Sequence, residues 1–141
     1  MLLAIAGEKP DRRIIDYAVE LCMRMKARLD VLQIVGPGLK GSAGRIRAQA
    51  DRFRRLVDSA AAAATFAEVG EPDPFATPAA ASVFDDLTVR SGPAAREIID
   101  YVDSRRDIVL TLYDPSLDGP GGRELPVRLK EGLPVPLVRL A

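Results

Sequence analysis

The first 35 residues place a helical segment between two apolar extended segments, and this order constrains the fold more than any other feature. Residues 2–5 read Leu-Leu-Ala-Ile, and residues 29–35 are rich in Val, Ile and Leu. The residues between them carry apolar side chains at helical spacing, namely Ile14, Ile15, Ala18, Leu21, Cys22 and Met25. A helix that connects two apolar strands is a βαβ unit, so we expect parallel strands joined by a right-handed crossover.

The same alternation of strands and helices continues to the end of the chain. We expect a long helix that begins after Ser42 as its N-cap and stops near Gly70, and a proline-rich loop at residues 71–82. The remaining expected elements are an edge strand at 83–90, a helix that opens at Pro93, a central strand at 108–112 covered on both faces, a loop at 113–122, a short helix with Pro126 in its first turn, and a last strand at 135–140. Five strands and four helices predict an open, layered α/β fold in one domain over residues 1–141.

Composition excludes several classes of function. Lys plus Arg and Asp plus Glu number 20 each, so no overall charge attracts the chain to nucleic acid or acidic lipid. Residues 36–55 are locally basic, and we interpret them as a solvated helix face rather than a docking face. The chain has no histidine, which removes the commonest general base and most zinc sites. We therefore expect no catalytic residues and no metal site.

The cysteine content and the hydropathy pattern bear on the environment of the chain. The one cysteine, Cys22, lies on the apolar stripe of the first helix and reads as a small buried hydrophobe rather than a catalytic thiolate. A lone cysteine forms no internal disulfide, which fits a reducing cytoplasm. No apolar run approaches 18 residues, so we expect neither a membrane span nor a signal peptide.

Three stretches of sequence together resemble one known family. They are residues 4–10 with 17–21 and 32–35, residues 89–94 before Ile98-Ile99, and the closing Pro-Val-Pro-Leu-Val-Arg at 134–139. In order and spacing they resemble the universal stress proteins, over nearly the whole chain. The resemblance implies a three-layer α/β/α fold of the adenine nucleotide alpha hydrolase type, with a five-stranded parallel sheet in the order 3-2-1-4-5. It also implies that some relatives bind ATP and that many dimerise through the last strand.

The implied strand order places a ligand at the switch point between the first and fourth strands. We expect a weak, degenerate pocket there, formed by Ala6, Gly7, Val35, Asp114, Gly119, Gly121 and Gly122. ATP-binding members of the family carry an Asp at the end of the first strand, where this chain has Ala6. These members also carry a Gly-x2-Gly-x9-Gly pattern followed by Ser or Thr. Gly119, Gly122 and Gly132 have this spacing, but Gly132 lies at the far end of the last helix and is followed by Leu133.

The charged residues around the expected pocket, which we call its rim, also bear on phosphate binding. Glu8, Asp114, Asp118 and Glu124 are acidic, and only Lys9 and Arg123 are evident as counter-charges. We therefore expect no tight binding of ATP and no obligatory cofactor, although weak binding of an adenine nucleotide stays open. Gly119 to Gly122 also leave open a site for a smaller anion, with a plain surface loop as the simpler interpretation. Tyr113 and Asp114 suggest either an acid pair at a pocket or, more simply, a sheet-end tyrosine before a proline turn.

The last strand suggests how the protein associates. Residues 135–140 are apolar and would form a sheet edge, which seldom remains exposed. We expect a homodimer through Val135, Leu137, Val138 and Leu140, together with an unknown protein partner.

The leading hypothesis is therefore a non-enzymatic stress-response protein that acts as a dimer. The alternatives are a nucleotide sensor with a rebuilt loop, an enzyme of the same superfamily, and a regulatory domain of a transporter or kinase. An enzyme is disfavoured because the chain lacks the His of nucleotidyl transferases and the Ser-Gly-Gly loop of N-type pyrophosphatases. It also lacks the acidic pair of phospho-receivers.

Overall fold

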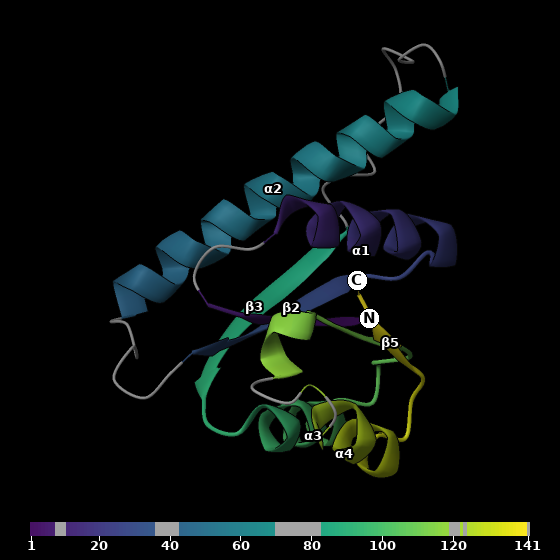
Figure 1. Ribbon diagram of the computed structural model, residues 1–141. Helices are drawn as coiled ribbons and strands as arrows, with labels where there is room; N and C mark the ends of the chain where they lie inside the picture. Colours follow the sequence, from purple (N-terminus) through teal and green to yellow (C-terminus); the bar gives the residue numbers. More distant parts are fainter. Residues whose placement is uncertain (8–10, 36–42, 70–82, 119–121, 123, 141) are drawn as a thin grey trace.

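The computed structural model describes residues 1–7, 11–35, 43–69, 83–118, 122 and 124–140. Strands and helices alternate along the chain as the sequence predicts (Figure 1). The elements are β1 (Leu2–Ala6), α1 (Arg12–Met25), β2 (Leu29–Val35), α2 (Ala43–Val69), β3 (Phe84–Ser91), α3 (Ala94–Ser104), β4 (Thr111–Tyr113), the 3-10 turn η2 (Pro115–Asp118), α4 (Glu124–Gly132) and β5 (Leu137–Arg139). The expected Ser42 cap, the Gly70 stop and the loop at 71–82 lie outside the described residues.

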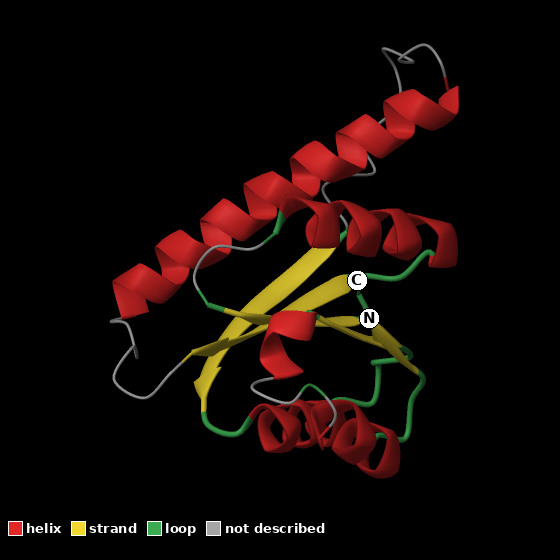
Figure 2. Cartoon of the chain, viewed as in Figure 1, coloured by secondary structure: helices red, strands yellow, loops and turns green. Residues whose placement is uncertain are grey.

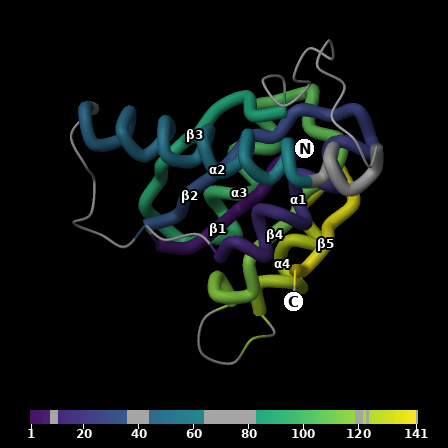
Figure 3. The backbone as a smooth tube through the Cα atoms, turned by 90° about the horizontal axis from the view of Figure 1, so that it is seen from above, coloured from purple at the N-terminus to yellow at the C-terminus, as the bar shows by residue number. Residues whose placement is uncertain are grey.

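The five strands form one parallel sheet in the order β3-β2-β1-β4-β5, which confirms the predicted topology (Figure 3). Helices α1 and α2 cover one face of the sheet, and α3 and α4 cover the other (Figure 2). Each face has its own hydrophobic core, because the strand side chains alternate between the two. Leu3 and Ile5 of β1 join the α1/α2 core, whereas Leu2 and Ala4 join the α3/α4 core.

Helix α1 shows how local sequence sets the ends of an element. The side chain of Asp11 accepts a hydrogen bond from the Arg13 backbone N–H at 2.9 Å, which caps the first turn. At the other end Lys26 adopts the left-handed conformation, with φ of 53°, and terminates the helix. Ile14, Ile15, Ala18, Val19 and Cys22 form its buried stripe. Of the predicted stripe, Leu21 is only partly buried and Met25 is 45% exposed.

The last two strands are shorter than predicted. Strand β4 covers 111–113 rather than 108–112, and β5 covers 137–139 rather than 135–140. The ladder between them begins where the Thr111 N–H bonds to the Pro136 carbonyl at 3.0 Å. Earlier residues have no β5 partner, and Val109 is 53% exposed instead of covered on both faces. The turn η2 lies within residues 113–122, which the sequence predicts to be a loop.

No helix in the described part of the chain is long and apolar enough to span a bilayer.

Burial of Cys22 predicts how its thiol reacts. The side chain is fully buried, its Sγ lies 3.4 Å from the Met1 Sδ, and burial raises the thiol pKa to about 11. At pH 8 only about one thiol in a thousand is ionised, and the thiolate is the reactive species. We expect Ellman's reagent to leave the native protein unmodified for hours and to react completely in guanidinium chloride. Full modification of the native protein within minutes would show that the α1/α2 core opens readily.

Candidate functional site

The topological switch point of the sheet lies between β1 and β4, as predicted. Strand β1 pairs with β2 on one side and with β4 on the other, so the strand order reverses there. Open α/β sheets bind ligands outside the carboxyl ends of the strands at this point. The residues at these ends are Ala6 of β1, Val35 of β2 and Tyr113 of β4. The fold therefore brings the predicted residues Ala6, Val35 and Asp114 to one edge of the sheet.

The turn after β1 is held by hydrogen bonds of its own. Gly7 has a φ of +74°, a left-handed conformation that glycine adopts without strain. Its N–H donates to the Ile34 carbonyl at 3.3 Å, and its carbonyl accepts from the side-chain amide of Gln33. Gln33 is only 2% exposed. These bonds occupy both backbone polar groups of Gly7, and Ala6 contributes no polar side chain.

The segment after β4 begins with an Asx turn. The Asp114 carboxylate accepts from the Ser116 N–H at 2.9 Å, and the Asp114 N–H donates to the Ala4 carbonyl at 2.9 Å. Tyr113 is fully buried at the end of the strand. The structure thus supports the simpler interpretation of Tyr113-Asp114, a sheet-end tyrosine followed by an aspartate that starts a proline turn.

An ion pair ties the η2 turn to the last strand. Arg139 donates from Nε and Nη2 to one oxygen of Asp118, at 2.9 and 2.8 Å. The Asp118 side chain is only 4% exposed, and its second oxygen has no hydrogen-bond partner among the described residues. Burial raises the pKa of the neighbouring Tyr113 phenol, and the Asp118 charge raises it further. Asp118 therefore acts as a structural anchor whose charge Arg139 balances.

These pairings make the rim less acidic than the sequence suggests. The Arg139 counter-charge comes from a distant segment, and a second one, Arg128, lies 2.6 Å from Glu124 on the exposed face of α4. Glu8, Lys9 and Arg123, which belong to the same charge count, lie outside the described residues.

The predicted glycines are only partly placed. Gly122 is half-buried just before α4, with φ of +59°, whereas Gly119 and Gly121 lie outside the described residues. Gly132 is the last residue of α4, so its amide is not at a helix start. A Cβ at Gly132 would collide with Ile99 of α3, and close helix packing is its evident role.

A groove also runs between α1 and β5. It has a volume of about 340 Å³ and is lined by Arg13, Ile14, Tyr17, Val138, Arg139 and Leu140. Sequence reasoning missed this groove, since its two walls are more than 100 residues apart and meet only through the sheet.

Comparison with known proteins identifies the fold. No protein-family model and no curated protein matches the chain. Among solved structures, a universal stress protein in complex with cAMP is 12% identical, with a TM-score of 0.61, over 99% of this chain and 95% of that one. UspA from Lactobacillus plantarum is 16% identical, with a TM-score of 0.55, over 100% and 97%. A protein from Archaeoglobus fulgidus in complex with dAMP is 12% identical, with a TM-score of 0.54, over 100% and 98%.

The architecture is thus a three-layer α/β/α fold of the nucleotide alpha hydrolase type. More particularly, the chain has the universal stress protein fold, which confirms at this level the resemblance seen in its sequence.

The Asp118–Arg139 pair predicts a difference between two neutralising substitutions. Asp118→Asn removes a buried charge that anchors η2 to β5, so we expect the thermal unfolding midpoint to fall by roughly 3–8 °C. The matched control, Glu124→Gln, removes one exposed partner of a helical ion pair and should shift the midpoint by less than about 2 °C. Equal shifts in calorimetric scans of the two variants would contradict the anchoring role.

Proposed function

We propose that the protein is a non-enzymatic regulatory protein of the universal stress protein type, which acts as a dimer and does not bind ATP tightly. The observation that carries the proposal is Ala6 at the carboxyl end of β1, beside the switch point. A ligand at this position would find a methyl group where a carboxylate acceptor is expected. Gly7 offers no replacement, since its N–H and carbonyl already bond to β2.

The magnitude of the missing interaction supports weak binding. A hydrogen bond to a charged group contributes about 1.5–3 kcal/mol, or roughly 10- to 100-fold in affinity. Asp114 is the nearest carboxylate in sequence after β4, and its Oδ1 is already engaged in the Asx turn. Loss of this acceptor changes a nucleotide dissociation constant of about 1 micromolar to roughly 10–100 micromolar or weaker.

The second candidate is an adenine-nucleotide sensor, and two observations favour it. Two proteins of the same fold were crystallised with cAMP and with dAMP, both adenine mononucleotides. In this chain the rim acids Asp118 and Glu124 carry counter-charges, which lowers the repulsion toward a single phosphate.

Isothermal titration with ATP, AMP and cAMP separates the two candidates. We expect dissociation constants weaker than about 10 micromolar for all three nucleotides. The Ala6→Asp variant restores the acceptor and should tighten binding roughly 10- to 100-fold, whereas Ala6→Asn, of similar size without the charge, should gain less. Tight binding of any of the three by the unmodified protein would establish the sensor instead.

The side chains available for acid–base or nucleophilic chemistry support a protein without enzymatic activity. The chain has no histidine, and Cys22 is buried with a raised pKa, so neither a histidine base nor an ionised thiol is at hand. Burial also raises the pKa of Tyr113 and keeps this phenol protonated at neutral pH. These observations support a binding or signalling role.

Dimerisation through β5 is supported by its place in the sheet. Strand β5 is an edge, and its inward hydrogen bonds use the Pro136 carbonyl and the Leu140 N–H. Alternate residues of a parallel strand bond to the same neighbour, so Leu137 and Arg139 direct their backbone groups to the open edge. Of the expected interface residues, Leu140 is buried in the protomer's own core. Val135, Leu137 and Val138 are partly buried and offer apolar surface to a second copy.

Light scattering tests the dimer. We expect twice the chain mass at tens of micromolar, and a shift to monomer in Val138→Lys, because two like charges would meet across the two-fold axis. Val127→Lys is the matched control, since Val127 is 53% exposed on α4 rather than on β5. A monomeric wild-type protein at these concentrations would refute this part of the proposal.

A further inference from the structure

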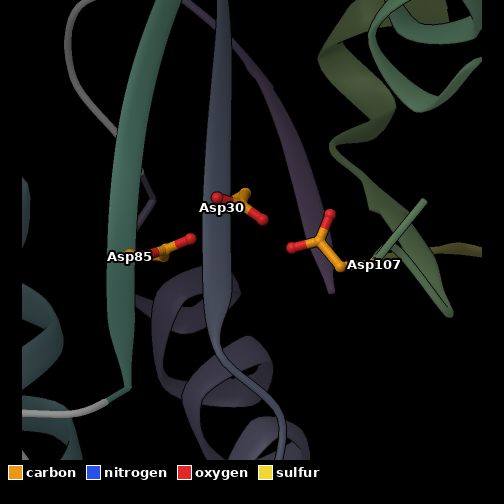
Figure 4. Close-up of side chains that lie close together, drawn as sticks. All are labelled: Asp30, Asp85 and Asp107. Carbon is orange, nitrogen blue, oxygen red and sulfur yellow. The ribbon is translucent and has the colours of Figure 1, made fainter. Parts of the chain in front are cut away.

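Three carboxylates converge at the amino ends of the strands, whereas the switch point lies at their carboxyl ends. They belong to Asp30 at the start of β2, Asp85 at the start of β3 and Asp107 in the turn before β4. One oxygen from each lies within 4.8 Å of the others. Figure 4 shows the three side chains pointing toward one another from separate segments.

A β-bulge produces this convergence. In the β2–β3 ladder Leu29 pairs with Phe84, but the next residue, Asp30, pairs with Asp86. Asp85 is therefore the extra residue of β3, and the local distortion of the strand brings its carboxylate toward Asp30. Bulges redirect side chains in this way and are common beside functional sites.

Asp30 provides a second observation, independent of the clustering. Its side chain is 3% exposed, and its Oδ1 is buried without a hydrogen-bond donor among the described residues. Arg105 is the nearest guanidinium, but its Nη1 is 3.5 Å from Asp30 and its Nη2 is 3.8 Å from Asp86. These separations exceed the roughly 2.7–2.9 Å of a charge-assisted hydrogen bond. The Asp30 Oδ1 therefore has an ion pair with Arg105 but no hydrogen-bond donor among the described residues.

Arg105 is shared between Asp30, Asp86 and the ring of Tyr101. Its Cζ lies 5.0 Å above the ring of Tyr101, so the guanidinium is held by a cation–π contact while it serves two carboxylates. Arg28 Nη2 is 3.1 Å from Asp85 Oδ1, so this carboxylate has an ion pair of its own. The pKa of Asp30 rises to about 6, first because of burial and then because of the Asp85 charge. Arg105 and the N-terminal ammonium lower this pKa, but they do not offset the effects of burial and of the Asp85 charge.

We propose that Asp30, Asp85 and Asp107 bind one hard divalent cation. Oxygen ligands from carboxylates suit Ca²⁺ or Mg²⁺, and two oxygens bound to the same Ca²⁺ ion are at most about 5 Å apart. The pairwise separations in the cluster lie within this limit for Ca²⁺. Asp107 is exposed, so water has access to complete the coordination from that side. The cation would join β2, the edge strand β3 and the start of β4.

Thermal unfolding with Ca²⁺ and with Mg²⁺ tests the proposal. We expect 10 mM of at least one cation to raise the unfolding midpoint of the wild-type protein by about 5 °C over its value in EDTA, because only the folded state assembles the site. Asp107→Asn and Asp85→Asn should each reduce this rise to less than about 1 °C. Asp107→Asn should also be at least as stable as the wild type in EDTA, since it removes a repelling charge.

The control is Asp103→Asn, which makes the same charge change at an exposed position of α3 outside the cluster. It should keep the full response to the cation. Calorimetric titration of the wild-type protein and of Asp107→Asn at 25 °C gives a second readout that does not depend on unfolding. Absence of a response in the wild-type protein to either cation would overturn the proposal, as would an equal response in the Asp107→Asn and Asp103→Asn variants.

Discussion

The pairing of β1 with β2 on one side and β4 on the other is the constraint on which the rest of the structure depends. It makes β1 the central strand, gives each sheet face a separate core, and sets the point where the strand order reverses. Residues 2–5 can serve as that strand because they are apolar on both faces. The residue that follows them, Ala6, then decides what the carboxyl edge offers a ligand.

Each end of the sheet holds a buried carboxylate, Asp118 or Asp30, with one oxygen that has no hydrogen-bond partner among the described residues. At the carboxyl edge the Gly7 turn, the Asp114 turn and the Asp118–Arg139 pair use their hydrogen-bonding groups internally. At the amino edge the Asp30 carboxylate is buried without a hydrogen-bond donor. Asp118 has an ion pair at 2.8 Å, whereas Asp30 has one at 3.5 Å and lies beside the carboxylates of Asp85 and Asp107, so the amino edge is where we propose a cation.

Much of the fold could be predicted from the sequence, because the signals are local. Helical spacing in α1, apolar runs in β1 and β2, and Pro126 near the start of α4 each specify their element. The ends of β4 and β5 could not be predicted, since a strand ends where its neighbour stops pairing, and this depends on distant residues. The charge balance around the switch point could not be predicted either, because Asp118 is paired with Arg139, which lies 21 residues later in the chain. Asp30 and Gln33 did leave a signal, as polar residues in an apolar strand, whereas the meeting of Asp30 with Asp85 left none because a bulge creates it.

The central claim is that the switch point beside Ala6 does not retain an adenine nucleotide. The most direct measurement is the nucleotide content of protein purified without added ligand, released by acid and quantified by chromatography. The account predicts far less than one adenine nucleotide per chain, at the level of a buffer control. Recovery of AMP, cAMP or ATP at close to one per chain would contradict it.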